Sequence, residues 1–424
     1  MNDIHDAFYK YEVTRFKKQN PHLLLGYGKY PMDWEGGYSK LADKKGMDAI
    51  FWSAFDYAHP EVRAHKLAII EEFITRWDND GIALDFERSA RYFKEYGKPE
   101  NAALMTDLIR KVKAILERTG KQRGRKLYFY VRVLPKIEVA YERGLDVRTW
   151  VREGLVNAIS PGHGRLTVTL DLKPWLELVR GRDCWIYPSI NPWRTTEETR
   201  AWAKLMYHRG AHGLQLFNYG HLIFGHDAHT PPPQAARVGT VWFADLHPDY
   251  YRVLHEIADT KSFEFKNKRY MLESVSHEGL ELGGGQLTRL IEAVDDIVLP
   301  VRLEVGTHRV GFGFADDLAE AQRRGASPRV TLRLKVVNYT QPDEFDVLVN
   351  GRLLPLGTRH TRAVFIMNND TWVTHPVPND LLQLGENTLE ISVRKLNPQL
   401  SAIPVLENME ILVEYDKGLG NDMT

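Results

Sequence analysis

Short apolar runs typical of β-strands alternate with amphipathic helical stretches over about the first 260 residues of the chain. Runs rich in β-branched and aromatic residues predict strands at Ala49–Phe55, Gly81–Glu87, Leu127–Leu134, Ala158–Pro161, Trp185–Ser189 and Gly213–Tyr219. Apolar residues at helical spacing predict helices over Pro60–Trp77, Asn101–Arg118, Thr196–Arg209 and Asp249–Ala258. Alternation of this kind is typical of βα units around a parallel sheet. Its regular spacing predicts a (β/α)8 TIM barrel over residues 1–260.

The pattern changes beyond Lys261, where short strands follow one another without helices between them. The predicted strands are Val301–Glu304, Val330–Val337, Phe345–Val349, Ala363–Met367 and Leu389–Val393. Turn residues separate them, at Asn350-Gly351 and at Gly385-Glu386-Asn387. Closely spaced strands predict an antiparallel β-sandwich over residues 261–424. It is either an accessory packing module or a glycan-binding surface, for which Trp372 and Tyr339 are the stacking candidates.

The charge balance argues against two classes of partner. The chain has 56 Lys and Arg and 56 Asp and Glu, so its formal net charge at pH 7 is zero. A nucleic-acid-binding protein needs an excess of Lys and Arg to replace the counterions of phosphate, and a protein held on a membrane surface uses clusters of basic residues. We therefore expect neither nucleic acid nor a membrane as a partner, while a homo-oligomer remains possible.

Cysteine content and motifs limit the chemistry further. Cys184 is the single cysteine, so no intrachain disulfide forms and a zinc site with several Cys ligands is excluded. Neither a Gly-x-Gly-x-x-Gly fingerprint nor a Walker A sequence occurs, and we expect no cofactor. The N-terminus lacks a signal-peptide pattern, and no apolar run reaches the roughly 20 residues that span a bilayer. A cytoplasmic location is the default, and a secreted or periplasmic one requires a signal peptide upstream of Met1.

The predicted strand Gly81–Glu87 carries the strongest candidate for a catalytic site. Active sites of TIM barrels lie at the C-terminal ends of the strands. Because side chains alternate along a strand, Asp85 and Glu87 share one face, which would point into the barrel. Two adjacent carboxylates raise the pKa of at least one of them, which suits a general acid for glycosidic bond cleavage. The alternative is a structural carboxylate that pairs with Arg88 or Arg132.

Two family resemblances include this strand. The octapeptide Asp80–Glu87 resembles the Asp-Gly-x-Asp-x-Asp-x-Glu strand of the family 18 chitinases, with Ala83 in place of the middle Asp. That resemblance implies the general-acid role for Glu87. A broader resemblance, to the glycosyl-hydrolase-like TIM-barrel proteins related to the family 10 hydrolase-like group, covers most of the first 260 residues. It implies roles for Asp85 and Arg88 but not for Glu87. The segments that carry this resemblance are Met1–His5, Asp56–Arg63, Gly81–Arg88, Gly144–Trp150 and Gly213–Tyr219.

The broader resemblance also implies that Met1–His5 lies at the end of the second barrel strand. The six predicted strands would then be the third to the eighth, and the chain would lack the first strand, the first helix and most of the second strand. An open seam would expose strand edges, which is unfavourable. The gap would be filled by residues encoded upstream of Met1, by Leu23–Tyr27 and nearby residues, or by another subunit.

Other strand ends supply further site candidates. Arg132, inside an apolar strand, would hold either a protein carboxylate or an anionic substrate. Asp56 follows the first predicted strand and is the preferred second carboxylate, although substrate assistance would dispense with it. Trp193 would stack on a sugar or pack within its loop. The remaining substrate-binding candidates are His163, Tyr187, Asn191, Asn218, Tyr219 and His5, with Asp3 beside the last of them. A His-rich cluster at His221, His226, Asp227 and His229 matches no metal-site spacing, so we predict no metal.

Together these observations predict a glycoside hydrolase that cleaves a poly- or oligosaccharide by carboxylate acid/base catalysis at the C-terminal face of a barrel. The predicted catalytic residues are Asp85, Glu87 and Asp56. One alternative is a non-catalytic glycan-binding protein on a degenerate barrel, and another is a barrel enzyme of a different class, such as an isomerase or lyase. The sequence leaves open the sugar, its linkage, endo or exo action, retention or inversion, and the oligomeric state.

Overall fold

The computed structural model describes residues 13–29, 51–87, 90–162, 169–190, 195–217, 253–273, 298–364 and 368–415. These residues fall into two compact units. The first holds the described residues up to 162 together with Leu172–Ser189, and the second holds the others. Within the described parts of the chain, no helix is long and apolar enough to cross a membrane.

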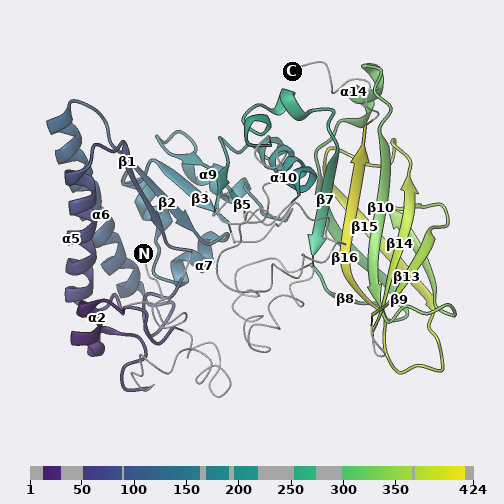
Figure 1. The fold of residues 1–424 in the computed structure, drawn as a ribbon, viewed down its shortest axis with the longest axis horizontal. Helices are drawn as coiled ribbons and strands as arrows, with labels where there is room; N and C mark the ends of the chain where they lie inside the picture. The colour runs from purple at the N-terminus through teal and green to yellow at the C-terminus, as the bar shows by residue number, and fades with distance from the viewer. Residues whose placement is uncertain are drawn as a thin grey trace, which may run out of the picture. The chain divides into compact units, whose positions relative to one another are not determined.

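The first unit is built on a parallel sheet of four strands that follow one another in chain order. The strands are β1 (Gly81–Asp85), β2 (Tyr128–Val133), β3 (Ala158–Pro161) and β4 (Trp185–Ile186). The helices are α2 (Arg15–Gln19), the 3-10 helix η1 (Pro21–Leu23), α5 (Pro60–Arg76), α6 (Pro99–Arg123), α7 (Ile137–Glu142), α8 (Val147–Arg152) and α9 (Lys173–Val179). Figure 1 labels α2, α5, α6, α7 and α9. The predicted βα units are confirmed over this sheet, and its closure into a barrel stays a prediction.

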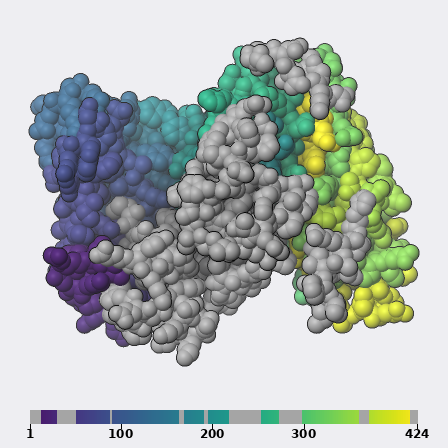
Figure 2. Space-filling view, in the orientation of Figure 1, coloured from purple at the N-terminus to yellow at the C-terminus, as the bar shows by residue number. Residues whose placement is uncertain are grey.

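Side chains alternate across the sheet as a period of two requires. In β2, Phe129, Val131 and Val133 are completely buried, and they point to the opposite face from Tyr130 and Arg132. Helix α6 packs on β2, and α5 packs on α6. These two helices form part of the visible purple-to-blue surface in Figure 2. The sheet therefore has one apolar face and one face that carries polar and aromatic side chains.

The predicted strand Ala49–Phe55 is wrong over its described part. Residues 51–54 form turns and a bend, and Phe55 makes a single antiparallel bridge with Leu24. The amide N–H of Gly26 donates to the carbonyl of Trp52 at 3.0 Å, and a Cβ at position 26 would lie 2.5 Å from Trp52 Cβ. The chain around Leu23–Tyr27 thus lies against this segment in turns, where only glycine fits at the closest approach.

Proline interrupts another predicted strand. The run Trp185–Ser189 forms β4 up to Ile186, and Pro188, which lacks an N–H donor, precedes β5 (Ser189–Ile190). Strand β5 pairs with β6 (Gln215–Leu216), which lies within the predicted strand Gly213–Tyr219. The predicted helices are confirmed as α5, α6 and α10 (Thr196–His208), and residues 253–256 of the predicted helix Asp249–Ala258 are helical.

The second unit contains two antiparallel sheets, as the spacing of its strands predicts. One has the order β13-β14-β10-β16-β7, with β8 also paired to β16, and the other has the order β12-β11-β15-β9. Alternate residues of β10 and β15 are buried, so each sheet has one face turned toward the core. The strands are β7 (Lys268–Glu273), β8 (Val301–Arg302), β9 (Gly306–Phe314), β10 (Arg329–Val337), β11 (Glu344–Val349), β12 (Arg352–Leu353), β13 (Thr358–Val364), β14 (Asn368–Val377), β15 (Gly385–Lys395) and β16 (Val405–Glu414).

Of the two predicted turns in this part of the chain, one is confirmed. Asn350 and Gly351 have φ of 49° and 78° between β11 and β12, as a tight hairpin turn requires. The turn predicted at Gly385-Glu386-Asn387 is wrong, because Gly385 begins β15. The buried Asn387 side chain accepts from the Gln383 N–H at 2.9 Å and donates to the Gln383 carbonyl at 2.8 Å. Asn387 therefore stabilises the preceding turn from within the strand.

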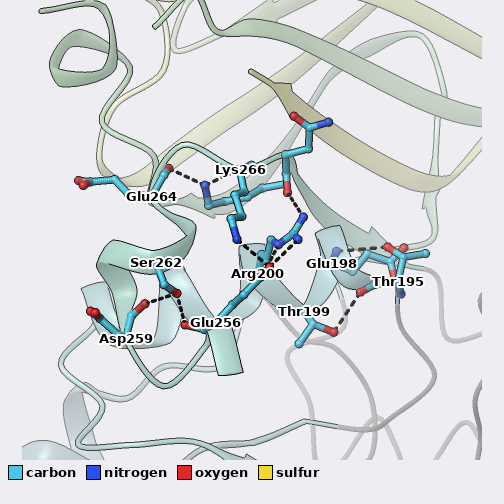
Figure 3. A network of polar contacts seen from close by, with 11 residues as sticks. Thr195, Glu198, Thr199, Arg200, Glu256, Asp259, Ser262, Glu264 and Lys266 are labelled. Atoms are coloured by element: carbon cyan, nitrogen blue, oxygen red, sulfur yellow. Dashed lines mark hydrogen bonds and ion pairs between the residues drawn. The ribbon is translucent and has the colours of Figure 1, made fainter. Parts of the chain in front are cut away.

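Helix α10 packs against β7, and a polar network joins the surrounding segments (Figure 3). Arg200 on α10 binds Glu256 through Nε and Nη2 at 2.6 and 3.1 Å, and Lys266 Nζ binds the same carboxylate at 2.8 Å. Burial alone would raise the pKa of Glu256, but hydrogen bonds from the two cations lower it. This contact joins segments on either side of residues 260 and 261, where the sequence predicts a domain boundary. That boundary stays a prediction.

A buried ion pair lies inside the second unit, next to the 3-10 helix η3 (Thr260–Phe263) and the helix α14 (Leu318–Arg323). Lys268 Nζ is 2.9 Å from Asp316 Oδ1, and both side chains are at most 1% exposed. Tyr270 and Tyr415 donate their hydroxyls to the two oxygens of Asp316. Burial lowers the pKa of Lys268, and Asp316 opposes that shift. Each charged group therefore has its compensating partner within the core.

Removing the carboxylate tests this pair. Asp316→Ala leaves the Lys268 ammonium buried without a counter-charge, and we expect a loss of about 3–5 kcal/mol in the free energy of unfolding. Urea titration followed by circular dichroism measures it. Asp380→Ala is the matched control, because Asp380 pairs with Arg352 at 2.7 Å on the surface, and its urea midpoint should barely change. Equal urea midpoints for the two variants would show that the buried ion pair contributes no more to the free energy of unfolding than the surface pair does.

Candidate functional site

A buried arginine joins two carboxylates at the end of the parallel sheet. Arg132 Nη1 donates to Asp85 Oδ2 at 2.8 Å, and its Nη2 donates to Glu87 Oε2. Arg132 Nε donates to the hydroxyl of Ser189 at 3.3 Å. These four residues are called the Arg132 cluster below. The pairing that the sequence offered as the structural alternative for these carboxylates is therefore present.

The backbone explains why these side chains meet. Asp85 and Arg132 face each other in the register of β1 and β2, and Phe86 N–H donates to the Arg132 carbonyl at 2.8 Å. Residues that are paired across neighbouring strands place their side chains on the same face. Ser189 approaches from the segment after β4, next to Gly162, where a Cβ would lie 2.8 Å from Ser189 Cβ. The C-terminal edge of the sheet therefore assembles the cluster from segments far apart in the chain.

Exposure differs sharply between the two carboxylates. The Arg132 side chain is 2% exposed and that of Glu87 is 10% exposed, whereas Asp85 is 31% exposed. Asp85 Oδ1 also accepts the backbone N–H of Glu87 at 2.9 Å, which fixes the orientation of the carboxyl group. Asp85 is consequently the member of the pair that a ligand in solvent can contact directly.

The guanidinium changes the electrostatics that the sequence alone suggests. Two bare carboxylates repel each other, but here a cation lies in contact with both, so much of that repulsion is cancelled. Nearby, the Tyr92 hydroxyl donates to the Phe86 carbonyl at 2.5 Å. Burial, with smaller contributions from neighbouring anionic groups including Asp85, raises the pKa of Tyr92. Tyr92 therefore remains a neutral donor that holds the end of β1.

Two tyrosines and a serine adjoin the Arg132 cluster. The rings of Tyr130 and Tyr187 have centroids 6.5 Å apart. Burial raises the pKa of Tyr130, while the hydroxyl of Ser160 and the charge of Arg132 oppose the shift. Tyr187 is a predicted substrate-binding residue, but Tyr130, Ser160 and Ser189 were not predicted. The period of two along β2 could have identified Tyr130, because it lies two residues before Arg132 on the same face.

Asp56, the third predicted catalytic residue, has its own set of partners. It is 3% exposed, its Oδ1 accepts from Ala58 N–H at 3.0 Å, and its Oδ2 is 3.9 Å from His59 Nε2 and 4.0 Å from Lys94 Nζ. The next residue, Tyr57, donates its N–H to the Tyr92 carbonyl at 2.7 Å. Asp56 is thereby tied to the loop that follows β1. Its catalytic role stays a prediction.

Several predicted site residues lie outside the described residues. They are Arg88, His163, Asn191, Trp193, Asn218, Tyr219 and His5, together with Asp3 and the His-rich cluster at residues 221–229. The substrate-binding roles of the first seven stay predictions. In the part of the chain that the structure describes, no group of three or more His, Cys, Asp and Glu side chains is arranged to hold a metal ion.

The known proteins that match this chain are solved structures. No protein-family model and no curated protein matches the chain. Among solved structures, a β-porphyranase of glycoside hydrolase family 86 from the human gut bacterium Bacteroides plebeius aligns over 74% of each chain, with 9% identity and a TM-score of 0.22. A second family 86 glycoside hydrolase and a variant of it, both in complex with neoagarooctaose, align over 89% of this chain and 80% of theirs. Their identity is 8% and their TM-scores are 0.26 and 0.27, values that do not show a shared fold.

The Arg132 cluster can be tested without a substrate. Arg132→Met leaves Asp85 and Glu87 side by side without their cation, and we expect a loss of about 3–5 kcal/mol in the free energy of unfolding at pH 7.

Urea titration at pH 7 measures this loss. Arg148→Met is the matched control, because Arg148 binds Glu138 at 2.6 Å with half of its side chain exposed, and it should leave the midpoint unchanged. Equal midpoints for Arg132→Met and wild type would show that the two ion pairs do not stabilise the fold.

Proposed function

We propose that the protein is a glycoside hydrolase in which Asp85 supplies the acid/base group. The observation that carries the proposal is the unequal exposure of the two carboxylates around one buried arginine, 31% for Asp85 and 10% for Glu87. Arg132 and the N–H of Glu87 hold Asp85 in place, while part of its carboxyl group faces solvent. An oriented carboxylate at the C-terminal end of a parallel strand is the arrangement that barrel enzymes use for catalysis.

Glu87 has a supporting role in this proposal. Its nearly buried carboxylate binds the second nitrogen of the Arg132 guanidinium, and so fixes the group that orients Asp85. This assigns the reactive position to Asp85, in keeping with the broader of the two family resemblances. Glu87 then acts through Arg132 as a positioning residue.

A two-carboxylate mechanism needs a second reactive group, and Asp56 is our candidate. The Tyr57–Tyr92 backbone bond ties its segment to the loop that follows β1. Its Oδ2 lies 3.9 Å from His59 Nε2 and 4.0 Å from Lys94 Nζ, two groups that would orient the carboxyl group for the role of base or nucleophile. The remaining substrate-binding candidates keep their proposed roles.

A glycan-binding protein without turnover is the second candidate. The observation in its favour is that Arg132 contacts both carboxylates, which is the arrangement of a structural ion pair. Aromatic side chains beside the cluster, Tyr130 and Tyr187, suit contact with the apolar face of a sugar ring. Under this reading aromatic rings would hold the sugar, and the carboxylates would serve the fold.

Turnover on a panel of polysaccharides tests the proposal. Product analysis by mass spectrometry identifies hydrolysis by the water added and separates it from a lyase or an isomerase. We expect Asp85→Asn to lower kcat by about 10²–10⁴-fold, the range that acid/base catalysis contributes. Asp183→Asn is the control, because Asp183 pairs with Lys126 on the surface, and it should keep full activity.

The same panel distinguishes the two candidates. Turnover that survives in Asp85→Asn would overturn the assignment of Asp85, even if the protein is a hydrolase. Binding without any turnover, retained in Asp85→Asn and lost in Trp193→Ala, would replace the hydrolase with the binding protein.

A further inference from the structure

Two arginines surround one tyrosine on the loops that follow β1 and β2. Arg143 Cζ lies 3.7 Å from the centroid of the Tyr96 ring, and Arg91 Cζ lies 5.3 Å from the same centroid. Arg91 and Tyr96 belong to the connection between β1 and α6, and Arg143 follows α7. Two cations therefore share one aromatic ring, and none of these three residues belongs to the Arg132 cluster.

Arg143 is buried without an acidic side chain in ion-pair contact among the residues that the structure describes. Arg143 is 7% exposed, and its buried Nη1 has no hydrogen-bond partner among the residues that the structure describes. Over the same residues it makes no ion pair with an acidic side chain, and the neighbouring Glu142 is exposed. Burying a charge is costly unless it is paired, so an arginine in this state calls for an explanation.

The electrostatic effect on Arg143 agrees with this geometry. Burial lowers the pKa of the Arg143 guanidinium, and the charge of Arg91 adds to this effect, while Tyr96 and Glu142 oppose it. Arginine nevertheless keeps its proton at any ordinary pH, so both residues remain cationic and repel each other. Stacking on Tyr96 recovers part of this cost through the negative face of the ring.

The surrounding loops are held in a fixed frame. Gly97 N–H donates to the Glu142 carbonyl at 2.9 Å and so joins the two loops directly. Gly144, at φ 87°, packs so closely that a Cβ would lie 2.6 Å from Phe93 Cε2. The two guanidinium groups are therefore positioned before any ligand arrives, which reduces the entropic cost of binding.

We propose that Arg143 and Arg91 form a binding site for an oxyanion, a carboxylate, sulfate or phosphate group. The Arg143 guanidinium is buried and would hold the anion in place. Arg91 is partly exposed, so the anion would enter from its side. The planar fork of a guanidinium matches the oxygens of these groups, and an anion between the two cations cancels their repulsion. The proposal does not depend on the hydrolase activity, because it uses none of the residues assigned to it.

Thermal unfolding with inorganic sulfate tests the site. We expect sulfate to raise the Tm of the wild type as its concentration increases, relative to sodium chloride at matched ionic strength. Arg143→Met should show a smaller increase, limited to the general stabilisation that sulfate gives to folded proteins, and Arg148→Met, on an exposed surface arginine, should show the full increase. Without sulfate, the Tm of Arg143→Met should equal or exceed that of wild type, because the substitution removes an uncompensated buried charge.

Two results would overturn the proposal. One is a sulfate response that is absent in the wild type or equal in wild type and Arg143→Met. The other is a lower Tm of Arg143→Met without sulfate, which would mean that the arginine serves structural stacking on Tyr96. Arg91→Gln provides a second variant if Arg143→Met does not fold, and it should weaken sulfate binding at least about tenfold in calorimetric titration.

Calorimetric titration also identifies the source of the oxyanion. Glucuronate and glucose 6-sulfate are compared with glucose, which has no charge, and with inorganic phosphate. Binding of the charged sugars but not of glucose supports the site and assigns it to an acidic sugar. Binding of inorganic ions alone supports the site and assigns it to a free anion. Equal binding of glucose and glucuronate would overturn it.

Discussion

The buried guanidinium of Arg132 is the constraint on which the candidate site depends. A cation at 2% side-chain exposure needs anionic partners, and the parallel register of β1 and β2 provides Asp85 and Glu87 on the same face. The site therefore combines two requirements in one arrangement. The fold needs the carboxylates to compensate the arginine, and the proposed chemistry needs one of them to keep contact with solvent. Asp85 keeps contact with solvent, and Glu87 is the more buried carboxylate that compensates the arginine.

Charge compensation takes the same form elsewhere in the chain. In the second unit, Lys268 pairs with Asp316, and Arg200 and Lys266 share Glu256. In both cases hydrogen bonds complete the shell around the buried charge, as low-dielectric surroundings require. Arg143 departs from this rule, since its main partner among the described residues is the face of an aromatic ring. A buried cation without an acidic partner among the described residues is what motivates a ligand at that position.

Elements with a strong local pattern could be predicted from the sequence, and weaker ones could not. The helix α6 shows apolar residues at helical spacing over many turns, and its extent matches the prediction with longer ends. The segment around Phe55 is apolar enough for a strand, but its pairing with Leu24 produces turns and a single bridge. The Asn387 side chain makes a hydrogen bond typical of a turn, while its backbone belongs to β15. Residue type alone therefore predicts the wrong structure at this position. In each failure a tertiary contact outweighs the local preference.

The order of residues along one strand was enough to place Asp85 and Glu87 on a common face, because side chains alternate with a fixed period of two. It also identified Arg132 as a charge inside an apolar strand. The tertiary structure decided that this arginine lies between both carboxylates, that Ser189 approaches it, and that Asp85 alone of the pair remains substantially exposed. The physical reason is that periodicity is a local property of the backbone. Burial and ion pairing depend on the register of strands tens of residues apart, which no short stretch of sequence specifies.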